Sequence, residues 1–206
     1  MKSRLKSVAL IILVFALAGC VTTPKRSSGG TVVETNDDIT ITARYYDRAE
    51  LNERYSERYV PFVAPPMLLT PTEFLVFDMR IETANAGSVI DTSEIRLDIN
   101  DNTYWAMSPP SLLRFWEGTA MYEDITGFNR TRFEQRINRE MITRPPSEKN
   151  GVALGLAVFR GRRFPAEGIV RISVPVTDIA TGRTRERNIA FELRQVGDGG
   201  IDPFRQ

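Results

Sequence analysis

The chain has 206 residues, with 27 basic and 26 acidic side chains and a formal charge of +1 near neutral pH. It contains no histidine and one cysteine, Cys20. Without an imidazole, Ser-His-Asp and Cys-His catalysis, histidine zinc sites and a histidine pH switch are excluded. The balanced charge does not indicate the basic surface that nucleic-acid-binding domains carry. We therefore expect no metal, no cofactor and no nucleic acid partner.

An export signal opens the chain. Lys2, Arg4 and Lys6 precede an uncharged apolar run over residues 8–17. This run is too short to span a bilayer as a helix, which needs about 20 residues. A basic start followed by a short apolar run is typical of a cleaved export signal.

The segment Leu17-Ala18-Gly19-Cys20 closes this signal and resembles the lipobox of bacterial lipoproteins. The resemblance implies cleavage before Cys20, a diacylglycerol on its thiol, and attachment to a membrane through lipid. Val21 follows the cysteine where aspartate favours inner-membrane retention, so in a two-membrane bacterium the resemblance favours the outer membrane, on its periplasmic face. The alternative is a plain secretory signal or an uncleaved anchor with an ordinary thiol. Cys20 has no second cysteine to pair with, which favours lipidation.

Composition divides the chain into four consecutive parts. After the signal come a lipidated cysteine with a small, polar, flexible tether, one folded domain, and a polar, glycine-rich tail. Their expected bounds are 1–19, 20–30, 31–196 and 197–206.

Alternation of apolar and polar residues predicts several strands. Residues 152–159 are apolar on both faces, which predicts a central, buried strand. Pro175 predicts an edge or strand-end position for its own strand. The Asn-Asp-Asn turn at 100–102 predicts a hairpin. The expected strands cover residues 38–46, 73–83, 93–100, 103–107, 152–159, 168–177 and 187–196.

Two short amphipathic helices are predicted from apolar residues four apart, over residues 48–59 and 131–141. The region 109–127 is apolar without a clean period and fits a helix or a strand.

These elements predict a mainly β fold, an antiparallel immunoglobulin-like β-sandwich of about seven strands with one or two short helices in the connections. From Phe74 onward the chain loosely resembles the immunoglobulin-like sandwich domains of bacterial lipoproteins of unknown function. The runs that carry the resemblance are 74–81, 155–159 and 174–191. It implies no site residues, and the inserts at 47–72 and 108–150 leave the strand order open.

Two acidic motifs have an ordinary alternative each. Residues 98–102 match the opening of a calcium loop, but Thr103 and Pro109 stand where glycine and glutamate are required, and a hairpin turn explains the same residues. Asp78 and Glu82 share one strand face with Arg80, and paired carboxylates can hydrolyse glycosides. Alternating charge on a wet sheet face is the ordinary explanation of the same residues.

Six side chains are candidates for a binding surface. Exposed aromatic residues would indicate a contact surface for protein or glycan, whereas buried ones would close one end of the sandwich. Clustered arginines can bind phosphates, lipid headgroups or sugar acids, whereas a solvated face is the common case. The candidates are Tyr104, Trp105, Trp116, Arg132, Arg136 and Arg139.

The hypothesis that fits best is a lipid-anchored envelope protein whose non-enzymatic β-sandwich binds or scaffolds another envelope protein or polymer. Two alternatives stay open. One is a carboxylate-dependent hydrolase of envelope material, and the other is a carrier of a hydrophobic ligand, which would require an apolar cavity.

Overall fold

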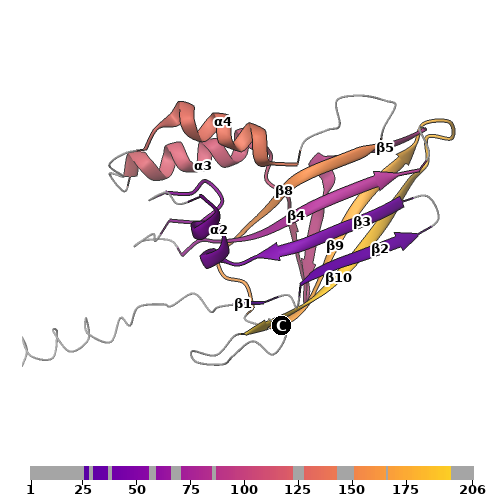
Figure 1. The fold of residues 1–206 in the computed structure, drawn as a ribbon, viewed down its shortest axis with the longest axis horizontal. Helices are drawn as coiled ribbons and strands as arrows, with labels where there is room; N and C mark the ends of the chain where they lie inside the picture. Colours follow the sequence, from indigo (N-terminus) through magenta and orange to yellow (C-terminus); the bar gives the residue numbers. More distant parts are fainter. Residues whose placement is uncertain are drawn as a thin grey trace, which may run out of the picture.

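Two antiparallel sheets packed face to face form the body of the protein, in a computed structural model (Figure 1). The predicted export signal, Cys20 and the predicted C-terminal tail lie outside the residues that the structure describes. Those residues are 26–27, 30–36, 39–55, 59–65, 71–84, 87–122, 128–142, 151–165 and 167–195.

The larger sheet has six strands in the order β1-β10-β9-β6-β7, with β5 pairing with β9. Its first strand takes Arg26 and Ser27, within the expected tether, and pairs them with β10. The strands are β1 (Arg26–Ser27), β5 (Ser88–Ile90), β6 (Arg96–Ile99), β7 (Asn102–Trp105), β9 (Gly168–Asp178) and β10 (Thr184–Gln195).

The smaller sheet has four strands in the order β2-β3-β4-β8. Every strand pairing within the two sheets is antiparallel. The prediction of a mainly β, antiparallel sandwich is therefore confirmed. The strands are β2 (Thr31–Asn36), β3 (Ile39–Tyr46), β4 (Glu73–Thr83) and β8 (Val152–Gly161).

The sandwich core lies between the sheets and follows from the alternation along each strand. On β4, Leu75, Phe77 and Met79 are buried and point inward. The Phe77 ring lies 5.2 Å from that of Phe191 on β10 and 6.0 Å from that of Phe159 on β8. Aromatic contact thus joins the two sheets, in the tilted and edge-on geometries that ring pairs prefer.

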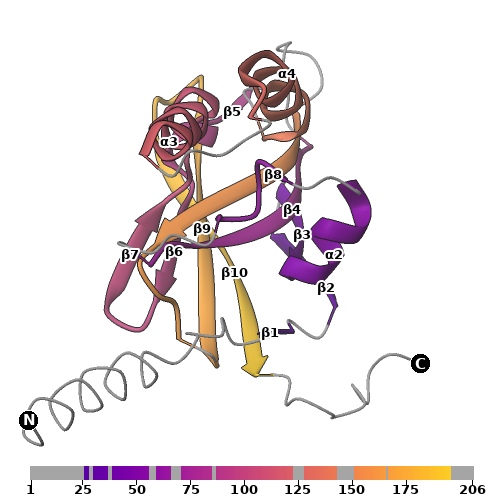
Figure 2. The ribbon, with the colours of Figure 1, turned by 90° about the vertical axis from the view of Figure 1, so that its left-hand side faces the viewer.

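Three helices form a third layer on the outer face of the smaller sheet. They are α2 (Arg48–Tyr55), α3 (Pro109–Tyr122) and α4 (Arg130–Glu140). Seen end on, α3 and α4 lie above β8 and β4, with α2 beside β3 and β4 (Figure 2). A second apolar core fills the space beneath them, built from Val76, Leu156 and Val158 of the sheet and from the buried faces of the helices. None of the described helices is long and apolar enough to cross a membrane.

The region that fitted a helix or a strand is the helix α3. Its apolar residues Leu112, Leu113, Phe115 and Trp116 show no clean period because α3 is buried on a broad face, packed against β8, α4 and the loop at 59–65. Ser108 precedes the helix, and its carbonyl accepts the N–H of Leu112 at 3.0 Å. Proline at the first helical position starts a helix without losing a hydrogen bond.

The other two helices were predicted, and each has a capping side chain. Asp47 accepts the N–H of Glu50 at 2.8 Å, while the Glu50 carboxylate accepts the N–H of Asp47 at 3.0 Å. This reciprocal pair is a capping box. Asn129 caps α4 by accepting the N–H of Arg132 at 2.9 Å.

The prediction that β8 is a central strand is wrong, because β8 ends the smaller sheet. It is still buried on both faces over Leu156 to Phe159, since the helical layer covers the outer face. The edge of β8 that pairs with no other strand of this sheet is covered over the same residues. Ile142, just after α4, donates to the carbonyl of Leu156 at 3.0 Å, and Met107 donates to the carbonyl of Val158 at 2.8 Å.

The prediction that Pro175 marks an edge or a strand end is also wrong, because Pro175 is the eighth of the 11 residues of β9 and β9 lies between β10 and β6. The Pro175 carbonyl accepts the N–H of Asp91 at 3.3 Å, so the main-chain polar atoms of this residue point away from β10. They face the gap between β5 and β6 that the short 3-10 helix η1 (Thr92–Glu94) occupies. A proline there removes no ladder hydrogen bond.

Substitution of Gly155 tests how closely the segment after α4 packs on β8. Gly155 has φ 141°, and an added Cβ would lie 2.6 Å from the Ile142 nitrogen and 2.8 Å from the Glu140 carbonyl oxygen. We expect Gly155→Ala to lower the free energy of unfolding by about 2 kcal/mol or more, measured by urea unfolding.

The matched control is Gly118→Ala in α3, where a Cβ meets nothing within 4 Å. It should raise stability by roughly 0.5–1 kcal/mol, and equal effects of the two substitutions would contradict this packing.

Candidate functional site

The three aromatic candidates have different environments. Trp116 is 1% exposed, and its indole N–H donates to the Pro61 carbonyl at 2.8 Å. Tyr104 points into the sandwich, where its ring packs 4.8 Å from that of Phe164. Trp105 lies on the opposite face of the same strand and is 56% exposed. Trp116 and Tyr104 therefore pack in the protein interior and offer no aromatic contact surface. Of the three candidates, Trp105 is the exposed one.

The arginine candidates lie on α4, over the other sheet, so the structure does not bring them together with Trp105. Arg139 donates from Nε and Nη2 to Oε1 of Glu140, at 3.2 and 3.0 Å. The Arg136 guanidinium lies over the Tyr55 ring, 5.0 Å from its centroid. Arg132 is exposed.

Arg136 ends a stack in which arginine and tyrosine alternate. Arg44 and Arg54 both lie over the Tyr46 ring, at 4.9 and 5.4 Å from its centroid. Arg54 also lies 5.5 Å from the centroid of Tyr55. Cations over aromatic faces are attracted by the ring quadrupole. The stack thus connects β3 to α2 and α2 to α4.

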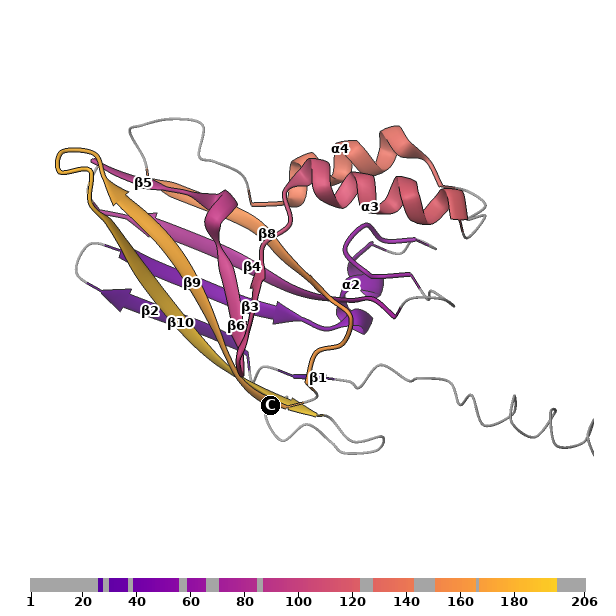
Figure 3. The ribbon, with the colours of Figure 1, turned by 180° about the vertical axis from the view of Figure 1, so that it is seen from behind.

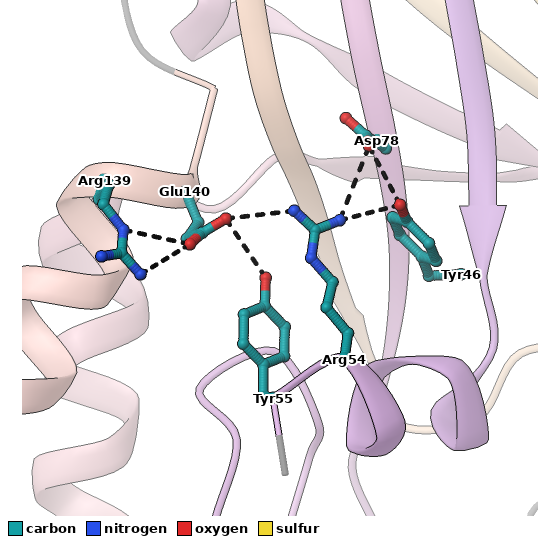
Figure 4. A network of polar contacts seen from close by, with 6 residues as sticks. All are labelled: Tyr46, Arg54, Tyr55, Asp78, Arg139 and Glu140. Carbon is teal, nitrogen blue, oxygen red and sulfur yellow. Dashed lines mark hydrogen bonds and ion pairs between the residues drawn. The ribbon is translucent and has the colours of Figure 1, made fainter. Parts of the chain in front are cut away.

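A network of polar contacts runs through the middle of this stack and is centred on Arg54 (Figure 4). The Arg54 Nη1 donates to the Tyr46 hydroxyl at 2.8 Å and lies 3.8 Å from the Asp78 carboxylate. Its Nη2 lies 3.4 Å from Oε2 of Glu140. The Tyr55 hydroxyl donates to the same Glu140 oxygen at 3.5 Å. One guanidinium therefore joins the sheet to two helices.

The surroundings of Tyr55 and Arg54 determine the protonation states of these two side chains. Burial raises the pKa of the Tyr55 hydroxyl to about 12, with Glu140 adding to the effect and Arg54 opposing it. Burial alone would lower the pKa of Arg54, but the nearby tyrosines and carboxylates outweigh it and raise that pKa. Near neutral pH, Tyr55 is a neutral donor and Arg54 is charged. Groups that titrate so far from neutrality are suited to holding a structure, not to proton transfer.

The carboxylates of β4 are engaged by separate partners. Glu82 accepts from Arg80 Nη2 at 2.7 Å, and this hydrogen bond lowers the pKa of Glu82. Asp78 accepts the Tyr46 hydroxyl at 3.2 Å, and Glu73 accepts the N–H of Phe164 at 2.8 Å. A general acid in a glycosidase pair needs a raised pKa, and the pKa of Glu82 is shifted in the opposite direction.

The segment that resembled a calcium loop forms the turn of the β6–β7 hairpin, as the alternative predicted. Asp98 accepts the Thr103 hydroxyl at 2.6 Å and lies 3.9 Å from Arg96 Nε. Asn100 takes a positive φ of 52°, which asparagine tolerates in turns. Over the described part of the chain, no three His, Cys, Asp or Glu side chains are grouped as a metal site would require.

Trp105 lies in a row of polar side chains that crosses the outer face of the larger sheet. The row is set by strand register, which places Arg96 opposite Trp105 and Ser173 opposite Arg96. Asn188 follows on β10 and accepts the Ser173 hydroxyl at 2.6 Å. Figure 3 shows this sheet from its outer side, with the three helices beyond one end and none across the strands.

No known protein family model matches the chain, and no curated protein is significantly similar to it.

Replacing Arg54 tests whether the network joins the layers. We expect Arg54→Ala to lower the free energy of unfolding by about 1 kcal/mol, because the largely buried Glu140 carboxylate loses a cationic partner. Arg54→Lys should restore part of this loss, since it keeps the charge without the planar stacking group. Chemical denaturation would measure both.

The control is Arg80→Ala, which breaks the exposed pair with Glu82. It should leave the unfolding midpoint nearly unchanged. An Arg54→Ala variant as stable as the Arg80→Ala variant would show that the network contributes little.

The raised pKa of Tyr55 predicts a loss of stability at alkaline pH. Between its unfolded value of 10.0 and its folded value of about 12, the unfolded chain has released the Tyr55 proton while the folded chain retains it. Folding stability therefore falls as pH rises through this window. Urea midpoints measured from about pH 9 to about pH 11.5 should fall less steeply for Tyr55→Phe than for the parent chain. Identical slopes would contradict the raised pKa.

Proposed function

We propose that the chain is a lipoprotein of the bacterial envelope, held on a membrane by lipid on Cys20. Its β-sandwich binds or scaffolds another envelope protein or polymer without catalysing a reaction. In a bacterium with two membranes, the protein sits on the periplasmic face of the outer membrane.

The anchor is supported by the sequence around Cys20. The lipobox follows a basic start and a short apolar run, and the cysteine is the only one in the chain. Each buried methylene contributes about 0.8 kcal/mol, so two or three acyl chains hold a protein on a membrane.

The binding role is supported above all by Trp105. A tryptophan that is 56% exposed on a regular strand leaves a large apolar surface in water. Exposed aromatic rings of this kind are enriched where proteins bind partners. The carboxylates of β4 engage neighbouring groups instead of forming an isolated pair, which supports binding over hydrolysis.

Removing the thiol tests this function. We expect the parent chain in the membrane fraction and Cys20→Ser in the soluble fraction, because the variant lacks the acyl chains that hold the protein on the membrane. Val21→Asp is the matched control. It should stay membrane-bound and, in a two-membrane host, move to the inner membrane. Retention of Cys20→Ser on membranes would refute the anchor.

The same strains test the binding role. Reversible cross-linking of intact cells, followed by capture of the chain, should recover one protein or polymer repeatedly from the parent and much less from Cys20→Ser. Recovery of no repeatable partner from the parent would count against a binding or scaffolding role.

A further inference from the structure

We propose that the outer face of the larger sheet, centred on Trp105, binds a neutral saccharide polymer of the envelope. This inference rests on the proposed function and specifies its partner. The site consists of Trp105, Arg96, Asp98, Thr103 and Asn188, on the adjacent strands β7 and β6 and on β10 of the same sheet.

Hydrogen bonds to neighbouring segments fix the backbone next to Trp105. The next residue, Ala106, donates to the Ile95 carbonyl at 2.8 Å and pairs with Phe159 across the corner of the sandwich. Met107 donates to the Val158 carbonyl at 2.8 Å. A ring on such a strand loses little backbone freedom on binding, unlike a ring on a loop tip.

The side chains around the indole are polar and already oriented. Arg96 lies directly across from Trp105 and donates to the Glu186 carboxylate at 2.6 Å. Asp98 is fixed by Thr103, whose hydroxyl donates to it at 2.6 Å. Guanidinium, carboxylate, amide and hydroxyl groups together supply donors and acceptors on one face. A sugar ring has the complementary chemistry, because its C–H face stacks on an indole while its hydroxyls form hydrogen bonds around the edge.

The charges favour a neutral ligand over an anionic one. Arg96 is shared between Asp98 at 3.9 Å and Glu186 at 2.6 Å, so its charge is already matched. A second arginine, Arg171, is exposed on β9 directly opposite Asp98, so this part of the face carries two arginines against two carboxylates. A site for phosphate or a sugar acid would carry an excess of arginines.

The lack of apolar neighbours favours a saccharide over a protein. Among the described residues, the other large exposed apolar side chain on a strand of this sheet is Ile169, which lies opposite Glu192 on β10 and four residues along β9 from Ser173. Val33 and Leu154 are on the smaller sheet. A protein interface has a core of several apolar and aromatic groups, whereas one ring among polar groups suits a sugar.

The length of the row favours a polymer. From Trp105 on β7 to Asn188 on β10 the row crosses three strand spacings, roughly 14 Å in total. This distance exceeds the width of one sugar ring, so a chain of sugars would contact both ends of the row.

Calorimetric titration of the full-length lipidated protein in detergent micelles tests the proposal. The probes are three neutral oligosaccharides: chitohexaose, cellohexaose and maltohexaose. We expect saturable binding of at least one of them, accompanied by a change in tryptophan emission from Trp105, because Trp116 is buried. Trp105→Ala should weaken that binding about tenfold or more, with Trp105→Phe intermediate because it keeps a smaller ring.

The matched control is Ile169→Ala, which removes an exposed apolar side chain from another part of the same sheet and should leave binding unchanged. Urea midpoints equal to the parent's would show that each variant is folded. Two results would overturn the saccharide site: no binding of any probe by the parent, or equal binding by Trp105→Ala.

Cross-linking separates this proposal from the proposed function. If a protein is captured and no saccharide binds, the saccharide site is wrong while the binding role stands. Loss of that protein in Trp105→Ala would then assign this face to a protein partner.

Discussion

Burial of β4 and β8 on both faces is the constraint on which the rest of the structure depends. Phe77 points into the sandwich while its neighbour Val76 points outward, and both are almost fully buried. A strand with two apolar faces cannot border water, so a two-layer sandwich does not suffice for this sequence. The helices supply the third layer at the end where the outer face is apolar. Beyond Asp78 the outer face becomes polar, and Arg80 and Glu82 pair with each other in solvent.

The sequence predicts most of this fold because apolar and polar residues alternate along a strand wherever one of its faces is buried and the other is exposed to water. It does not predict β1 and β5, which are two and three residues long and too short to show a period. It also misses β2, six residues in which the apolar side chains Val32 and Val33 are adjacent and do not alternate with polar ones. It also leaves α3 ambiguous, since a helix buried on a broad face loses its apolar stripe. Placing Pro175 at an edge failed for a different reason. The cost of a proline depends on which side its missing N–H would face, and only the pairing of the neighbouring strands determines that.

The candidate sites are less predictable than the fold. Trp105 and Trp116 look alike in sequence, yet one is exposed on a sheet face and the other lies on the buried face of α3. Arg54 and Glu140 are 86 residues apart and meet only because α2 and α4 cover the same sheet. No local pattern indicates such a pair. The capping box of Asp47 and Glu50, three residues apart at the start of α2, was the one signal in this region that could have been read directly.

The covered edge of β8 has a consequence for how copies of this protein meet. An open edge strand offers a row of N–H and C=O groups that a second chain can extend, which leads to aggregation. Here the segment before α3, at Met107, and the segment after α4, at Ile142, donate hydrogen bonds to carbonyls of β8. Another copy of the chain therefore cannot pair with β8 over residues 156–159. Any change that loosens the packing of α3 and α4 on the sheet would expose the unpaired N–H and C=O groups of β8 as well as an apolar core.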